Sequence, residues 1–372
     1  MSVLKIAGAI LFYLGGYIAM HIFIHREIAR GLEFPKWLRG ISTILFIIIG
    51  SMLISSRILD SFLNTNILFL IGATWFGIIF TALPVFVLEF ILRMIFKEKR
   101  KIFAYCATIL TIVLSVAALF ISRYGLRLKE IELKYDNLPK QLNGYTIIQI
   151  SDLHLGALTT TEWFNDVVNR VNHENPDLIV ITGDLLDQDI CDYKEYCELL
   201  RSLKAKDGVF IIPGNHEYYA GYSSFEKVVQ ESNLTLLVNE NKRLNWNTYI
   251  AGLDDPAGER MKNTKPDIEK TLKGIDKDKF LIFLSHRPEY YDVVYDKGAD
   301  LVLAGHTHAG QIFPNDLIIR FYMKYHYGLY KKNDSYLYTT SGTGTWGPPM
   351  RLFARAEIVK ITLVPGSTSK HL

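Results

Sequence analysis

Side chains that bind metal ions occur at five points in the C-terminal two-thirds of this 372-residue sequence. Each point follows a short, strongly apolar run of the kind that forms a buried strand. Carboxylates, imidazoles and amide oxygens together suit divalent ions such as Mn²⁺, Fe²⁺, Zn²⁺ or Co²⁺. We therefore predict a centre for two such ions, with seven candidate ligands: Asp152 and His154 in SDLHLG, Asp184 in TGDLLD, Asn215 in PGNHEYY, His286 in SHRPE, and His306 and His308 in GHTHAG.

The chemistry that such a centre supports is hydrolysis at a phosphate group. Two ions about 3.5–4 Å apart bind the phosphate and lower the pKa of a water molecule, so that hydroxide forms near neutral pH. Two dications repel each other, and a carboxylate between them offsets this repulsion. Asp184 is the candidate for the bridging position. Glycine precedes a candidate ligand at residues 183, 214 and 305, where it permits tight backbone geometry beside an ion.

The elements that must position these residues alternate between strand and helix. Helical patterns around residues 160–174, 192–203, 223–231 and 289–297 separate short β-branched runs, which is typical of a parallel or mixed sheet covered on both faces. The runs before the ligands are YTIIQIS, DLIVIT, GVFIIP, FLIFLS and DLVLAG, and KEIELKYDNLP predicts an edge strand that ends at Pro139. Ligands bind beyond the carboxyl ends of such strands. We therefore expect all seven candidates at one edge of the sheet.

The first third of the chain is dominated by long apolar stretches. Those at residues 3–24, 40–56, 67–92 and 102–122 approach or exceed the roughly 20 helical residues that cross a hydrocarbon core. The first exceeds the ~7–15 apolar residues of a signal peptide and lacks an A-x-A-like site after it, so we expect it to be retained. We predict a bundle of four transmembrane helices over residues 1–122, a connector with the edge strand over 123–144, a catalytic domain over 145–364 and a tail over 365–372.

The charges of the connecting loops indicate the orientation of this anchor in the bilayer. Residues 25–39 and 93–101 together carry nine Lys and Arg, whereas the middle loop carries only Arg57. Positively charged loops stay in the cytoplasm. We therefore expect both termini and the catalytic domain on the extracytoplasmic side, although Arg123, Arg127 and Lys129 on the last flank oppose this orientation.

The charge of the C-terminal domain argues against a nucleic-acid partner. Residues 1–122 carry 11 Lys and Arg against 5 Asp and Glu, and the remainder carries 30 against 33. A nucleic-acid-binding domain concentrates positive charge, and this one does not. Cys191 and Cys197 are six residues apart on an expected helix, where their side chains diverge, and a disulfide between them is left open.

The ordered motifs D-x-H, GD, GNH, a lone histidine and GHTH resemble those of the calcineurin-like metallophosphoesterases over roughly residues 145–362. The resemblance implies a layered α/β/β/α domain, a sandwich of mixed sheets. It further implies that His216 lies near the substrate phosphate and protonates the leaving oxygen or stabilises its charge. By the same resemblance, one metal would be held by Asp152, His154, Asp184 and His308, and the other by Asp184, Asn215, His286 and His306.

A narrower resemblance rests on GNHEYY, GHTHAGQ and SGTGTWGPPMR together with the N-terminal apolar stretches. This combination is similar to bacterial membrane-anchored phosphoesterases related to the enzymes that hydrolyse UDP-2,3-diacylglucosamine. Many relatives have glycine where this chain has Ala309, which puts the substrate in doubt more than the metals.

Several residues near the motifs have two interpretations each. Tyr218 and Arg351 are candidates for substrate binding: the planar guanidinium of Arg351 suits a phosphate, although a solvent-exposed arginine is the alternative. Glu217 is either structural or substrate-facing. Asp187 is interpreted as a loop or helix-cap residue, and Trp346 as a lid or a packed aromatic.

The sequence thus predicts a multi-pass membrane protein whose metal-bound hydroxide cleaves a phosphodiester, phosphomonoester or pyrophosphate bond. The weaker part of this hypothesis is a lipid-linked or cell-envelope substrate. Two alternatives stay open: a pyrophosphatase of the UDP-2,3-diacylglucosamine type, and a membrane sensor or scaffold that keeps metals without turnover. The native metal and the oligomeric state are not indicated.

Overall fold

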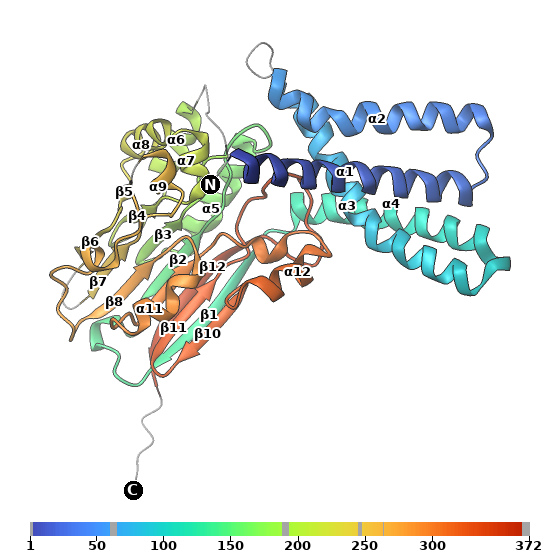
Figure 1. The fold of residues 1–372 in the computed structure, drawn as a ribbon. Coiled ribbons are helices and arrows are strands. Elements are labelled where there is room, and N and C mark those ends of the chain that lie inside the picture. The colour runs from blue at the N-terminus through green and yellow to red at the C-terminus, as the bar shows by residue number, and fades with distance from the viewer. Residues whose placement is uncertain (1–2, 60–64, 188–192, 245–247, 263, 367–372) are drawn as a thin grey trace, which may run out of the picture. The chain divides into compact units, whose positions relative to one another are not determined.

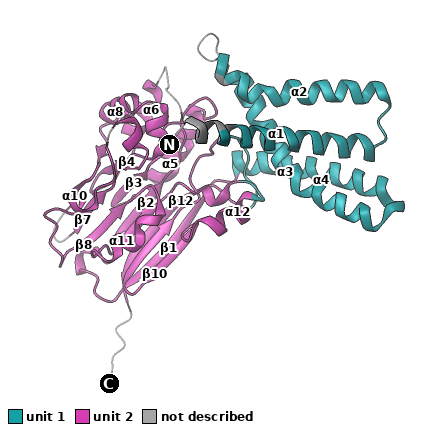
Figure 2. Cartoon of the chain, in the orientation of Figure 1, with its two compact units in different colours: residues 1–124, 312–314, 347–353 teal, residues 125–311, 315–346, 354–372 magenta. Residues whose placement is uncertain are grey.

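The computed structural model describes residues 3–59, 65–187, 193–244, 248–262 and 264–366. The chain divides into two compact units, which Figure 2 shows in different colours. The helical unit comprises residues 1–124, 312–314 and 347–353, and the second unit comprises the remainder. Cys197 is a buried free thiol in the second unit, and Cys191, its candidate disulfide partner, lies outside the described residues.

The helical unit is built from four long helices: α1 Val3–Gly31, α2 Lys36–Leu59, α3 Asn66–Ile95 and α4 Arg100–Tyr124 (Figure 1). Small residues let them approach closely. A Cβ on Gly72 of α3 would collide with the backbone of Leu53 in α2, and one on Gly31 of α1 would collide with Ala104 in α4. Such contacts between small residues are typical of helices that pack within a membrane.

The prediction of four membrane-spanning helices was wrong in number. Among the described residues, three stretches are long and apolar enough to span: Lys36–Ser56, Asn66–Ile95 and Lys97–Tyr124. Helix α1 is not among these three stretches, and its C-terminal part carries Arg26, Glu27 and Arg30. Glu27 is buried and pairs with Arg93 of α3, which accounts for a charged side chain inside this unit.

The second unit contains two six-stranded mixed sheets among its described residues. In the first, β2 to β5 run parallel, and β12 joins β1 in parallel and β2 in antiparallel orientation. In the second, β7, β8, β9 and β11 run parallel, with antiparallel β6 and β10 at the edges. In spatial order the first sheet is β1 Arg127–Tyr135, β12 Glu357–Pro365, β2 Thr146–Ile150, β3 Leu178–Thr182, β4 Val209–Ile212 and β5 Thr235–Leu236; the second is β10 Gly328–Lys332, β11 Ser335–Thr339, β9 Leu301–Ala304, β8 Phe280–Leu284, β7 Thr248–Gly252 and β6 Glu240–Arg243.

Three hydrophobic clusters give this unit its layers. Strands of both sheets contribute to one cluster, which includes Ile147, Val180, Ile282 and Leu303 and lies between the sheets. Helices cover the outer faces: α5, α6 and α8 pack on the first sheet, and α10 and α11 on the second. The helices of this unit are α5 Thr161–His173, α6 Lys194–Arg201, α7 Asn215–Ala220, α8 Tyr222–Glu231, α9 Gly258–Met261, α10 Ile268–Thr271, α11 Tyr291–Tyr295 and α12 Asn315–Tyr322. The unit is an α/β fold with mixed sheets, as predicted.

Two short stretches from the C-terminal part of the chain belong to the helical unit. Ile312, Met350 and Leu352 form a buried cluster with Ala118 of α4. The backbone N–H of Arg351 donates a hydrogen bond of 3.0 Å to the carbonyl of Ala118. The sequence placed both stretches in the catalytic domain, because nothing in their local pattern distinguishes them from the loops around them.

Candidate metal centre

The seven predicted ligands lie just beyond the carboxyl ends of parallel strands. Asp152 and Asp184 come two residues after β2 and β3, and Asn215 comes three residues after β4 in the same sheet. His286 and His306 come two residues after β8 and β9, which are neighbours in the second sheet. The ligands therefore gather where the ends of both sheets meet, and not at the edge of one sheet.

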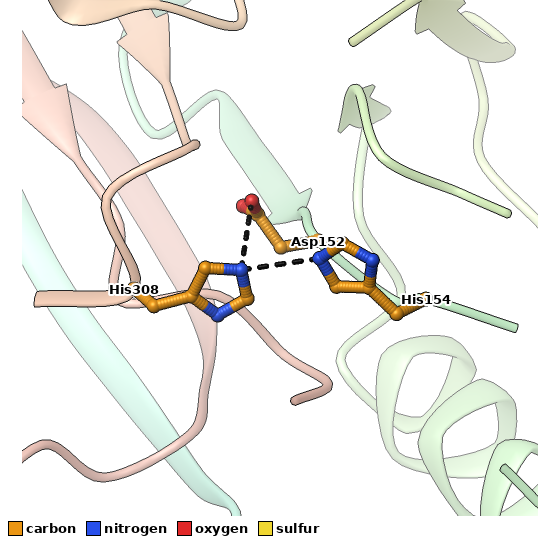
Figure 3. Close-up of side chains that lie close together, drawn as sticks. All are labelled: Asp152, His154 and His308. Carbon is orange, nitrogen blue, oxygen red and sulfur yellow. Dashed lines mark hydrogen bonds and ion pairs between the residues drawn. The ribbon is translucent and has the colours of Figure 1, made fainter. Parts of the chain in front are cut away.

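The first group of ligand atoms comprises Asp152, His154 and His308 (Figure 3). The Nε2 atoms of His154 and His308 are 3.1 Å apart, and Nε2 of His308 is 3.4 Å from an oxygen of Asp152. All three residues are buried. Asp184 approaches the same group, with Oδ2 3.8 Å from Nε2 of His154.

The second group comprises Asp184, His286 and His306. Nε2 of His286 is 3.2 Å from Oδ2 of Asp184 and 3.2 Å from Nδ1 of His306. Nδ1 of His286 lies 2.8 Å from the carbonyl oxygen of Thr182, which leaves Nε2 as the ligating atom. Asp184 thus faces both groups, which is the place predicted for the bridging carboxylate.

The residues present fit a pair of divalent ions. Imidazole nitrogens and carboxylate oxygens, the atoms that coordinate such ions, lie within about 3–4 Å of one another. The side-chain oxygen of Asn215 is buried and has no hydrogen-bond partner, as expected for an oxygen reserved for a metal. A buried polar atom left unpaired is costly, and an ion at this position removes the cost.

The backbone of the ligand loops is held in a sparsely populated conformation. Left-handed φ angles in residues other than glycine cost free energy and cluster at functional sites. Five of the seven ligands have such angles: Asp152 at 52°, His154 at 47°, Asp184 at 52°, His306 at 72° and His308 at 49°. The surrounding structure therefore imposes the conformation of each of these residues.

Close packing around the ligand loops explains the glycines that precede three ligands. A Cβ on Gly214 would collide with Asp184, and one on Gly305 would collide with Ser151 and Asp152. Gly183 has a φ of +89°, and a Cβ there would lie 2.5 Å from Nδ1 of His286. Only glycine fits at these positions.

Buried carboxylates lie beside imidazoles in this centre, and each affects the pKa of the other. Burial opposes the charge of Asp184, yet the positive charge of His286 and a hydrogen bond to it hold the pKa of Asp184 well below its usual range. Burial likewise opposes the charge of His286, but Asp184 and Asp152 raise the pKa of this histidine to about 10. Burial and the charge of His286 lower the pKa of His306 to about 3. A proton on His286 thus supplies the positive charge that a metal ion would supply.

His216 lies at the edge of the first group and retains 14% of its side-chain exposure. Its ring is 4.7 Å, centroid to centroid, from that of His154. Its Nδ1 is 3.2 Å from Asp187, whose other close neighbour is Nδ1 of His154 at 3.4 Å. Asp187, interpreted from the sequence as a loop or cap residue, therefore orients both the predicted catalytic histidine and a predicted ligand.

Glu217 holds two ligand loops in place. It is fully buried, and its carboxylate accepts backbone N–H hydrogen bonds from Asp184 at 2.9 Å, Leu186 at 3.0 Å and Gly214 at 2.6 Å. These donors flank Asp184 and Asn215, so Glu217 fixes the backbone of both residues. From the sequence, Glu217 is interpreted as either structural or substrate-facing, and these contacts match the structural role.

The two candidates for substrate binding are both buried in this structure. The hydroxyl of Tyr218 donates a hydrogen bond to Asp254, and its ring stacks on that of Tyr222. Arg351 is fully buried and belongs to the helical unit. Neither residue lies among the grouped ligand atoms, and their role in binding stays a prediction.

Sequence reasoning missed Arg287 and Asp255. Their side chains form a two-pronged ion pair, with nitrogen-to-oxygen distances of 2.8 and 3.3 Å, and Nη1 of Arg287 is 3.4 Å from Nε2 of His306. Two signals could have found them: Arg287 directly follows a ligand, and Asp255 lies three residues after β7.

Aromatic side chains flank His216 on its exposed side. The rings of Tyr219 and Trp346 lie 5.7 and 5.9 Å from its ring, and both are more than half exposed. The backbone N–H and carbonyl of Trp346 pair with the side-chain amide of Gln311, both at 2.9 Å. Trp346 is therefore not a packed core aromatic, and its backbone is tied to the loop that carries His308.

We predict that Glu217→Gln destabilises the protein by about 1–3 kcal/mol and lowers its metal content. The amide replaces one acceptor oxygen with a donor, which faces a backbone N–H and leaves a buried group unsatisfied. Thermal unfolding and bound-metal analysis would measure both effects. Glu195→Gln, on an exposed position of α6, is the matched control and should change neither quantity. Equal stability and metal content in the two variants would contradict this role of Glu217.

Comparison with known proteins identifies the family of the second unit. The model of the calcineurin-like phosphoesterases matches residues 145–310. An uncharacterized metallophosphoesterase of Helicobacter pylori is 37% identical over 241 residues, which cover 64% of this chain and 64% of that protein. The chain thus spans slightly less than two-thirds of the length of that relative.

Two further relatives extend the similarity into the N-terminal part. A transmembrane protein with metallophosphoesterase domain from Danio rerio is 32% identical over 270 residues, 69% of this chain and 62% of that protein. An uncharacterized metallophosphoesterase of Campylobacter jejuni is 31% identical over 360 residues, 92% of this chain and 94% of that protein. With its divalent-metal ligand types gathered at the strand ends, this chain belongs to the calcineurin-like metallophosphoesterases, which are metal-dependent phosphoric ester hydrolases.

Proposed function

We propose that the seven residues hold two divalent ions and that this centre hydrolyses a phosphoester presented at a membrane. The observation that carries the proposal is the position of Asp184, which faces both groups of ligand atoms while His216 stands beside them with an exposed edge. When bound, the ions supply positive charge to the phosphate and lower the pKa of water. The ligand types suit Mn²⁺, Fe²⁺, Zn²⁺ or Co²⁺.

His216 is the residue of this chain that we assign to proton transfer. Its Nδ1 faces Asp187, so Nε2 is the atom available to protonate the leaving oxygen. Burial opposes its positive charge, but the contact with Asp187 and the charge of Asp184 raise the pKa of His216 above its usual value. A histidine that stays protonated near neutral pH suits the role of general acid.

We expect His216→Ala to lower the rate of phosphodiester hydrolysis by roughly 10²–10⁴-fold, because a positioned acid contributes about that much. Metal content should stay unchanged, since none of the proposed ligands is removed. His173→Ala, on an exposed histidine of α5, is the matched control and should retain full activity. Hydrolysis would be measured with a chromogenic diester, and bound metal by elemental analysis.

The same experiment discriminates the enzyme from a sensor or scaffold. A wild-type protein that binds metal yet hydrolyses no phosphoester with Mn²⁺, Fe²⁺, Co²⁺ or Zn²⁺ would support the scaffold. Activity that survives His216→Ala would remove this histidine from the mechanism but leave the metal centre in place.

We further propose that the catalytic domain faces the extracytoplasmic side. The distribution of basic residues in the loops supports the same orientation with three spans as with four. Basic residues flank the start of α2 and the turn between α3 and α4, where Lys97, Lys99, Arg100 and Lys101 lie. If both points are cytoplasmic, α4 crosses outward and the domain that follows lies outside.

Cysteine labelling in intact cells tests this orientation. In a background in which Cys106, Cys191 and Cys197 are replaced by alanine, we expect Lys297→Cys in the second unit to react with a membrane-impermeant maleimide. Glu98→Cys, between α3 and α4, should react only after the cells are opened. The reverse pattern would place the catalytic domain in the cytoplasm and favour a nucleotide-lipid pyrophosphatase that meets cytoplasmic substrates.

A lipid-linked or cell-envelope phosphoester is the substrate class that we propose. Support comes from the three apolar helices of the same chain and from the exposed rings of Tyr219 and Trp346 beside His216. Tyr218 and Tyr222 are two further aromatic residues of the same segment. Their rings stack on each other at 4.7 Å, and Tyr218 is buried, so we leave this pair out of the proposal.

We expect detergent-dispersed lipid phosphates to be cleaved with a higher kcat/KM than a soluble diester. A screen should compare a phosphatidic acid, a diacylglycerol-linked diester, a UDP-linked diacylated sugar and a chromogenic diester. Trp346→Ala should reduce the preference for lipid while retaining turnover of the soluble diester. Equal turnover of all four compounds would contradict a lipid-linked substrate and leave the phosphoesterase assignment untouched.

A further inference from the structure

Helix α12 carries an exposed apolar face. Leu317, Ile318, Phe321 and Tyr322 are all exposed, with Phe321 at 89% and Tyr322 at 83%. Their spacing of one, four and five residues places them on one side of the helix. None of the residues of α12 is buried, so this helix does not serve the core of its own unit. Exposed apolar surface of this kind marks a contact with a partner or a membrane.

The chain enters α12 from residues that pack against candidate membrane spans. Residues 312–314 directly precede Asn315 and belong to the helical unit. There, Ile312 lies in the cluster of Ala118, and Phe313 packs against the same cluster together with Ile78 and Phe80 of α3. The polypeptide is therefore attached to the spans at the residue before the first residue of α12.

These contacts lie well inside the spans and not at their ends. A Cβ on Gly77 of α3 would meet the sulfur of Met350 at 2.5 Å. Gly77 is about 17 Å along α3 from its first residue, at 1.5 Å per residue. The whole of α3, at 30 residues, is about 45 Å long, against roughly 30 Å for a hydrocarbon core. If α3 spans a bilayer, Met350 thus packs on a part of it that lies within the hydrocarbon depth.

From these observations we infer that α12 lies in the lipid–water interface, with the face formed by Leu317, Ile318, Phe321 and Tyr322 in contact with lipid. A lipid surface is favoured as the occupant because the chain leaves the membrane helices immediately before α12. Arg320, exposed in the last turn of α12, suits anionic head groups, whereas Lys324 lies two residues beyond the helix and pairs with Asp292 at 2.9 Å. The inference concerns membrane contact and stands whether or not the proposed substrate is correct.

This placement bears on the metal centre through the chain itself. His308 lies seven residues before α12, and the pairing of Gln311 with Trp346 joins the two stretches that continue into the helical unit. The loop that carries His308 would then lead directly into α12, which contacts lipid. The Gln311–Trp346 pair would connect this loop to the second stretch that enters the helical unit.

Quenching of a fluorescent label tests the inference on the full-length chain in phosphatidylcholine–phosphatidylglycerol vesicles. Bimane is attached to Ile318→Cys or Phe321→Cys in the background that lacks Cys106, Cys191 and Cys197. Val293→Cys, on an exposed position of α11, is the matched control. Phospholipids with a nitroxide near the head group report lipid contact, and iodide reports contact with water.

We expect labels on α12 to be quenched several-fold more by the nitroxide lipids than the label on α11, and to be protected from iodide. Labels on α12 that behave like the label on α11 would overturn the inference. Protection from both quenchers would overturn it too, because a protein surface, such as a second copy, would then cover the face.

A photocrosslinker keeps the test decisive if the cysteine-free background does not fold. Benzoylphenylalanine replaces Phe321 in the otherwise native chain, and Val293 in the control. Crosslinks from position 321 to phospholipid, absent from position 293, support the inference. Crosslinks to a second chain, or none to lipid, contradict it.

Discussion

Burial of the Asp184 carboxylate is the constraint on which the rest of the centre depends. A buried anion is tolerated only when positive charge and hydrogen-bond donors surround it. Here His286 stands 3.2 Å from one oxygen, and the backbone N–H of His216 donates a hydrogen bond of 2.9 Å to the other. A second buried carboxylate, Glu217, accepts the backbone N–H of Asp184 itself. Two acids so close together make the site electrostatically costly without cations, which favours the binding of divalent ions.

The sandwich of two sheets is what allows one carboxylate to serve two groups of ligands. β2 and β3 deliver Asp152 and Asp184 from one sheet, and β8 and β9 deliver His286 and His306 from the other. Both sets of strands end at the same side of the unit, and the shared core between the sheets fixes their separation. Because the ligand loops also adopt left-handed backbone angles, the strands must be rigid enough to impose them.

Local patterns predicted what depends on a few consecutive residues. The strands before the ligands are runs of β-branched and apolar residues, such as LIVIT and FLIFL, and the structure has strands there. The contacts of Glu217 and Asp187 with the ligand loops could not be predicted, since they depend on how loops from different strands meet. Arg351 illustrates the same limit: its glycine-rich surroundings suggested an accessible phosphate-binding loop, yet long-range packing buries it beside α4.

The helical unit shows a further limit of prediction from apolar stretches. Hydrophobicity counts apolar residues but does not reveal that Glu27 pairs with Arg93 inside the helical unit. Residues 312–314 and 347–353 also belong to this unit, and they are too short to be recognised from an apolar pattern in the sequence. Their apolar side chains cover surface on α3 and α4 that would otherwise face lipid or water. Apolar burial therefore attaches the residues after His308 to the helices. The loop that carries the predicted ligand His308 therefore continues directly into residues that pack on the helices.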